Sequence, residues 1–129
     1  MSNIKLNFIH ICDYASLADG EKLNVMGIFK NIFGFQLPII HLQMFIVSNI
    51  TVSEIREYIQ TLRLVNSSGV DIISPIKLSS SVINENNKDI GLLIQLNSVK
   101  FEKEGEYRFI LDVNGEKVGE VPLLVSLKK

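Results

Sequence analysis

The residues best suited to bind a metal or to act as a nucleophile are His10, Cys12 and Asp13, with His41 further along the chain. His10 and Cys12 are two positions apart, so on a β-strand both side chains point to one face, as zinc ligands could, and Asp13 points to the other. A catalytic zinc site takes about three protein ligands and a structural site about four, so this set suffices only if His41 folds onto it. A Cys–His nucleophile pair also lacks a third residue to orient the base. The alternative, which we favour, makes Cys12 a small buried apolar residue and His10 a hydrogen-bonded strand residue.

Three carboxylates, Asp13, Asp19 and Glu21, surround one loop and could bind a calcium ion. Asp19-Gly20 is more simply a turn signal, with Asp13 accepting hydrogen bonds from local backbone amides. We favour the turn.

Charged residues of both signs alternate between positions 100 and 108, which indicates a solvated loop rather than a phosphate-binding patch; they are Lys100, Lys103 and Arg108 with Glu102, Glu104 and Glu106. The sequence contains no Gly-rich phosphate loop, no His-Glu-x-x-His, no Cys-x-x-Cys and no Gly-x-Ser-x-Gly. We therefore predict no catalytic, cofactor-binding or metal-binding residue, and a protein that is not an enzyme.

The segment from Phe29 to Phe45 is the most apolar part of the chain and holds four of its seven phenylalanines. Gly34 and Pro38 break it into pieces, and one strand can bury only one or two faces. Part of it could therefore form an exposed surface for a partner protein or a second subunit, with Phe33, Phe35, Pro38 and His41 as the candidate contact residues. The alternative, which we favour slightly, is that this connection packs beneath both layers of the fold, with His41 at the rim of the core.

The elements that must position these residues belong to one domain, residues 1–129, because a chain of 14.5 kDa is too short for two cores. Hydrophobic residues make up 47% and charged residues 21%, which excludes a disordered chain. The net charge is −1, so the chain lacks the excess of basic residues that a dedicated nucleic-acid-binding protein needs.

No apolar stretch is long enough to span a bilayer, the start does not resemble a signal peptide, and a single cysteine cannot form an internal disulfide. We expect a soluble, cytoplasmic protein.

Most of the chain alternates apolar and polar residues with period two, which predicts strands. The clearest is Tyr107–Val113, followed by the hairpin signal Asn114-Gly115 and a partner strand over 116–127, in which Pro122 requires an edge position or a bulge. Residues 53–62 fit either a helical turn or a strand, and we favour a strand from about Glu57.

Seven to nine short strands with turn signals between them, and no helix longer than one turn, predict an all-β, immunoglobulin-like sandwich of mostly antiparallel strands. Gly105 and Tyr107 resemble the tyrosine corner of such sandwiches, in which the phenol ties a crossover loop to the backbone.

Both ends of the chain resemble a family of small uncharacterised bacterial proteins. The matching stretches are Cys12-Asp13-Tyr14-Ala15, the run 19–29 from Asp19 to Phe29, Ile32-Phe33 with Pro38 and His41, and the tail from Gly105 through Gly115 to Val125. The resemblance implies a β-sandwich and assigns no catalytic residue.

Three functions remain open at this point. The first is a non-catalytic binding or scaffold module that acts by protein–protein contact and can self-associate, with no nucleic-acid or membrane partner. The second is a metal-dependent or Cys/His enzyme centred on His10, Cys12 and His41. The third is a carbohydrate binder, which the absence of tryptophan weakens and which a flat, exposed Tyr14 or Tyr58 would favour.

Overall fold

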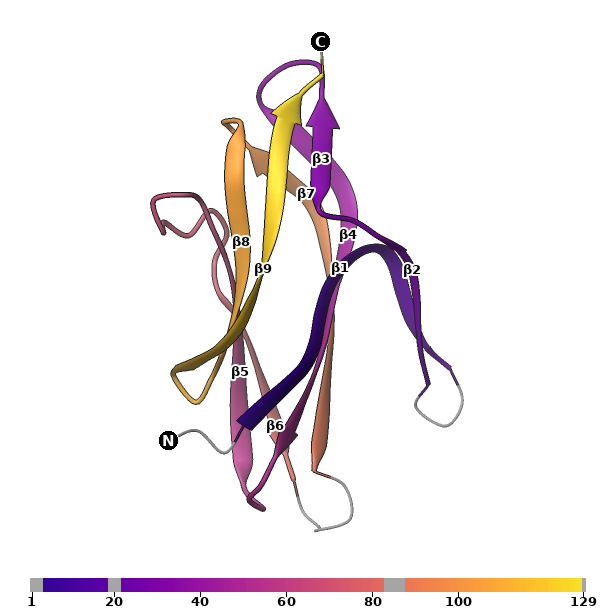
Figure 1. The fold of residues 1–129 in the computed structure, drawn as a ribbon, viewed down its shortest axis with the longest axis vertical. Coiled ribbons are helices and arrows are strands. Elements are labelled where there is room, and N and C mark those ends of the chain that lie inside the picture. Colours follow the sequence, from indigo (N-terminus) through magenta and orange to yellow (C-terminus); the bar gives the residue numbers. More distant parts are fainter. Residues whose placement is uncertain (1–3, 19–21, 83–87, 129) are drawn as a thin grey trace.

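The computed structural model describes residues 4–18, 22–82 and 88–128, and this part of the chain consists of strands and their connections without a helix (Figure 1). The strands are β1 (Ile4–Ala18), β2 (Lys22–Ile28), β3 (Asn31–Gly34), β4 (Ile39–Val52), β5 (Glu57–Val65), β6 (Ile76–Ser81), β7 (Asp89–Phe101), β8 (Gly105–Val113) and β9 (Glu116–Leu127). The all-β prediction is confirmed. The strand alternative for 53–62 is also confirmed, because residues 53–56 form bends and β5 begins at Glu57. The described residues contain no helix that could cross a membrane.

The strands form two sheets, which confirms the sandwich. One sheet has the order β2-β1-β4-β7 and the other the order β3-β9-β8-β5-β6. All neighbours are antiparallel except β3 and β9, which run parallel. We call them the four-stranded and the five-stranded sheet.

Alternation explains how the two sheets close on each other. In β8, Tyr107, Phe109, Leu111 and Val113 are buried while the residues between them mostly face outward. Facing residues of the other strands complete one continuous core, which includes Ile11, Met44, Ile46, Ile50, Leu62, Leu64, Ile94, Phe101, Leu123 and Val125.

The β8–β9 hairpin turns where the sequence predicts it. Asn114 and Gly115 both have positive φ, 52° and 81°, as a type I′ turn requires. A bulge lies in β9 at Val118, because Gly119 pairs with Leu111 while Lys117 pairs with Asp112, but it does not accommodate Pro122. Pro122 lies two residues before Leu124, where pairing with β3 begins, so at Pro122 β9 is still an edge toward β3, as the edge alternative expected.

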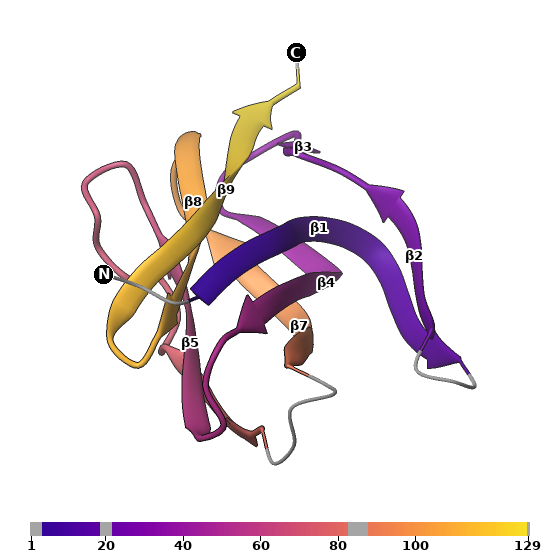
Figure 2. The ribbon, with the colours of Figure 1, turned by 60° about the horizontal axis from the view of Figure 1, so that its bottom comes forward.

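The four-stranded sheet curls, so that the second half of β1 and all of β2 form an arm beyond the sandwich (Figure 2). The left-handed Gly27, with φ of 70°, lies in this arm, and a register shift against β4 follows Leu6 in the first half of β1. On the outer face of the sheet the curl buries a second small apolar cluster, formed by Cys12, Ala15, Phe45 and Val47 with Phe8, Leu23, Val25 and Leu93 around them.

Candidate interaction surface

The apolar segment 29–45 divides between the core and the surface. Ile32 of β3 and Ile39 of β4 are buried and anchor the connection on either side. Gly34 lies directly against Ile39, since a Cβ atom on Gly34 would come within 2.6 Å of the Ile39 Cγ1 atom. This close approach fixes the connection between β3 and β4 at one end of the sandwich, with its remaining side chains turned outward.

The outward side chains are large and apolar. Phe33 is 60% exposed and Phe35 is 84% exposed, and Leu37, Ile40 and Leu42 are exposed as well. At about 200 Å² for a phenylalanine residue, Phe33 and Phe35 together expose about 290 Å². The slightly favoured prediction, that this connection packs beneath both layers, is therefore wrong for these residues, whereas Ile32, Ile39 and Met44 lie in the main core and Phe45 is buried in the second cluster.

Beyond Lys30 the same segment carries no formal charge. From Asn31 to Ser53 the sequence has no aspartate, glutamate, lysine or arginine. Exposed apolar side chains without charged neighbours along the chain are typical of contact surfaces, whose centres are depleted in charged residues.

The other two predicted contact residues lie differently. Pro38 is exposed beside Leu37. His41 is half-buried, and its ring centroid lies 5.5 Å from that of Phe29, which packs against the core. The candidate interaction surface therefore consists of Phe33, Phe35, Leu37 and Pro38, with His41 at its border.

The structure does not bring His41 to His10 and Cys12. Cys12 pairs with Phe45 across β1 and β4. His41 lies four residues before Phe45 in β4, and a strand rises about 3.3 Å per residue, so the backbone of His41 is about 13 Å from this pair. Cys12 is fully buried, its thiol donates to the Phe45 carbonyl oxygen at 3.7 Å, and burial raises its pKa. His10 stacks on Phe8, with ring centroids 5.6 Å apart. Among the described residues, no three His, Cys, Asp or Glu side chains are placed to hold a metal ion.

Of the calcium candidates, only Asp13 belongs to the described residues, and Asp19 and Glu21 lie outside them. The Asp13 carboxylate covers Gly27, where a Cβ atom would meet its Oδ2 atom at 2.5 Å. Asp13 thus lies against the backbone of the β1–β2 arm.

The two tyrosines considered for carbohydrate binding are not equivalent. Tyr58 is buried and its hydroxyl donates to the Glu54 carbonyl oxygen at 2.9 Å. Tyr14 is 47% exposed, and its ring packs edge-on against Phe45, with centroids 5.3 Å apart. Tyr58 therefore offers no stacking platform, and Tyr14 offers a partial one.

Gly105 and Tyr107 lie at the start of β8. Gly105 has a φ of 143°, and the Tyr107 hydroxyl donates to the Lys103 carbonyl oxygen at 2.7 Å. This is the bond from phenol to backbone that defines a tyrosine corner. The Tyr107 ring also packs edge-on against Phe101, at 4.9 Å, so the corner is joined to the core.

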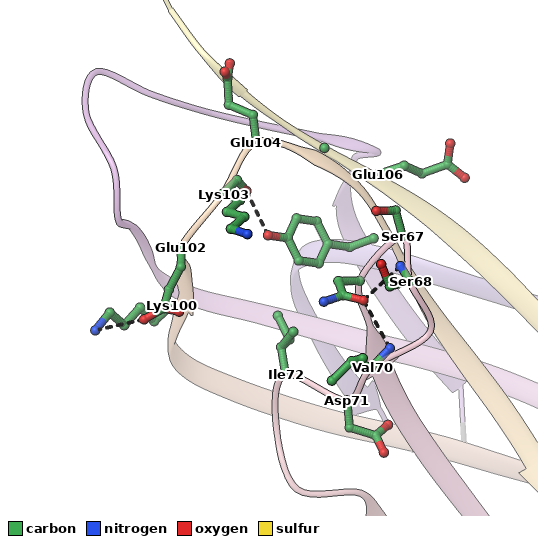
Figure 3. Close-up of a pocket in the computed structure, with 13 residues that line it drawn as sticks. Ser67, Ser68, Val70, Asp71, Ile72, Lys100, Glu102, Lys103, Glu104 and Glu106 are labelled. Carbon is green, nitrogen blue, oxygen red and sulfur yellow. Dashed lines mark hydrogen bonds and ion pairs between the residues drawn. The ribbon is translucent and has the colours of Figure 1, made fainter.

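A pocket of about 560 Å³ opens beside this corner, between residues 66–72 and 100–107 (Figure 3). Its rim is polar: Asn66 Oδ1 accepts hydrogen bonds from the Ser68 and Val70 amides, and Lys100 pairs with Glu102 at 3.6 Å. Glu104 accepts the Leu127 amide at 2.7 Å. Neither histidine nor cysteine lines it. This pocket was not predictable from the sequence, because only the fold brings these two distant loops together.

Comparison with known proteins places the chain without assigning an activity. The sequence model of one protein family, described as a family of unknown function (DUF6941), matches residues 7–126. None of the curated proteins matches this chain. The match confirms the resemblance to an uncharacterised family.

Proposed function

The chain belongs to the DUF6941 family, and we propose that it is a non-catalytic binding module that acts by protein–protein contact through the candidate interaction surface. The observation that carries this proposal is the exposure of Phe33 and Phe35, at 60% and 84%, on a connection anchored by two buried isoleucines. Aromatic side chains, phenylalanine among them, are enriched at the centres of protein interfaces.

The chemistry of the surface supports an apolar kind of partner. Because residues 31–53 carry no formal charge, the partner surface should also be apolar and poor in charge at its centre. An apolar partner gains from removing both phenylalanine rings from water, whereas a charged partner would lose hydration without gaining a counter-ion.

The test compares two variants. In the first, Phe33→Asp and Phe35→Asp are combined; in the control, Ile55→Asp changes a residue that is also half-exposed but lies beyond the opposite end of β4. The tagged proteins are used to capture partners from lysate of the source cells, and their association state is measured by sedimentation velocity.

We expect the double variant to lose capture at least tenfold while the control captures like the unmodified protein, with both retaining the circular dichroism and unfolding midpoint of a folded chain. Capture and association state that are unchanged in a folded double variant would reject the proposal.

We also propose that the protein works in the bacterial cytoplasm. The chain has a single cysteine, Cys12, which is buried and free, so its stability does not depend on an oxidising compartment. Localisation of a tagged copy in fractionated cells tests this directly.

A further inference from the structure

We propose that two copies of this chain join through the free edge of β7, so that their four-stranded sheets form one continuous sheet across a two-fold axis at Ile94. The proposal is independent of the candidate interaction surface, which lies on a different part of the fold and stays available to another partner.

β7 is the long edge of its sheet. It spans 13 residues, and among the described residues it pairs only with β4, on one side (Figure 2). An unpaired strand edge presents a row of amides and carbonyls that readily accepts another strand, and proteins usually protect such edges with charge, proline, bulges or short length.

The other edge strands have such protection and most of β7 does not. β3 has four residues, β6 has six and includes Lys77, and β2 carries the left-handed Gly27. In contrast, β7 has no charged residue and no proline from Ile90 to Val99, and its first irregularity is Ser98, with φ of 52°. Residues 90–97 are therefore an uninterrupted and uncharged edge.

One hydrogen bond fixes which groups of β7 point outward. The Val52 amide donates to the Lys88 carbonyl oxygen at 2.9 Å, just beyond the end of the β4–β7 ladder. In an antiparallel ladder hydrogen-bonded pairs recur every second residue, so Ile90, Leu92, Ile94 and Leu96 direct their amides and carbonyls toward β4. Gly91, Leu93, Gln95 and Asn97 direct theirs away from it, and among the described residues none of these four amides or carbonyls has a hydrogen-bond partner.

The four outward residues are evenly spaced about Ile94, so a second copy of β7 can pair with all four of them, and the absence of charge from Ile90 to Val99 lets two identical edges meet without repulsion. Placed antiparallel across a two-fold axis at Ile94, Gly91 faces Asn97 of the other copy and Leu93 faces Gln95. Each of the four outward amides of one copy then donates to an outward carbonyl of the other copy, and the reverse also holds. No other antiparallel register of β7 against itself uses all of them.

Side chains agree with this register. On the core face Ile94 meets its own copy and Leu92 meets Leu96, so the cross-strand pairs are apolar and extend the core that already buries these residues. On the outer face Leu93, Gln95 and Asn97 bring no charge near the axis, so like-charge repulsion between identical copies is absent there.

The test uses the unmodified protein and two substitutions at one position. Gln95→Pro removes an outward amide without removing a bond to β4, and Gln95→Ala removes the same side chain but keeps the amide. Molar mass is measured by light scattering over a concentration series, amide exchange is measured by NMR at the highest concentration, and unfolding midpoints verify that each variant folds.

We expect a dimer in which the amides of Gly91, Leu93, Gln95 and Asn97 are protected from exchange. Gln95→Ala should retain the dimer, and Gln95→Pro should weaken it at least tenfold. A protein that stays monomeric at millimolar concentration, or a dimer whose four outward amides exchange freely, would overturn the proposal. Because the Phe33 and Phe35 substitutions leave β7 unchanged, failure of the dimer and failure of the proposed function are distinguishable.

Discussion

The Tyr107 hydroxyl donates a hydrogen bond to the carbonyl oxygen of Lys103, four residues earlier in the chain and 2.7 Å away. The bond closes the corner between β7 and β8, at the point where the chain crosses from one sheet to the other. Tyr58 makes the equivalent bond to Glu54, at 2.9 Å, where the chain crosses from β4 to β5. Two of the crossings between sheets are thus tied by a tyrosine and a carbonyl four residues before it.

These bonds predict matched effects on stability. Tyr107→Phe and Tyr58→Phe should each lower the free energy of unfolding by about 1 kcal/mol, because each leaves a carbonyl without its partner in a partly buried place. Tyr14→Phe, at an exposed tyrosine, is the control and should change it by less than about 0.5 kcal/mol. Urea denaturation of the four proteins measures this. If Tyr107→Phe were as stable as Tyr14→Phe, the corner would not stabilise the fold.

The β5 residue Gln60 is a polar side chain inside the core. It is 1% exposed, and neither amide atom of its side chain has a hydrogen-bond partner among the described residues. Gln60→Met should raise the free energy of unfolding by about 1–2 kcal/mol, because burying an unpartnered amide is unfavourable and methionine has a similar shape.

The exposed Gln36 offers a matched control for this substitution, and Gln36→Met should be neutral. Guanidinium denaturation gives both values. A loss of stability in Gln60→Met would mean that the amide has partners in solution that compensate its burial.

Burial of Cys12 predicts a pH dependence. Removal from water, with a smaller effect of Asp13, raises the pKa of its thiol above the ordinary value of 9.0. Above about pH 9 the unfolded chain therefore releases this proton while the folded chain keeps it, and the free energy of unfolding falls as the pH rises. Below pH 9 both states hold the proton and the contribution is complete.

The measurement is urea denaturation between pH 7 and pH 10 of the unmodified protein and of Cys12→Ala. The difference between the two proteins should be constant below pH 9 and should shrink above it. A constant difference over the whole range would show that the folded thiol titrates like an unfolded one.

Local signals made the fold predictable. Residues 107–127 were predictable because their alternation and the Asn114-Gly115 turn act over neighbouring positions, and the structure has the same hairpin. The curl of β1 and β2 was not predictable from local signals. It depends on the contact of Cys12 and Ala15 with Phe45 and Val47, which lie about thirty residues away in the sequence.

The candidate interaction surface was only half predictable for a related reason. When nearly every residue of a segment is apolar, the pattern does not indicate which side chains face inward. The outward direction of Phe33 and Phe35 follows from the contact of Gly34 with Ile39 and from the parallel pairing of β3 with β9, both of which are tertiary. The free edge of β7 likewise follows from the order of the strands in the sheet, and the alternation of apolar and polar residues over 90–96 does not indicate that order.

Site-specific photo-crosslinking tests the central claim, contact through the candidate interaction surface, most directly. A benzophenone amino acid is placed at Phe35, which is 84% exposed, and in a separate chain at Ile55, beyond the other end of β4. The proposed function predicts a discrete protein adduct from position 35 in cells and none of that mass from position 55. Equal labelling at the two positions, or no adduct at position 35, would contradict it.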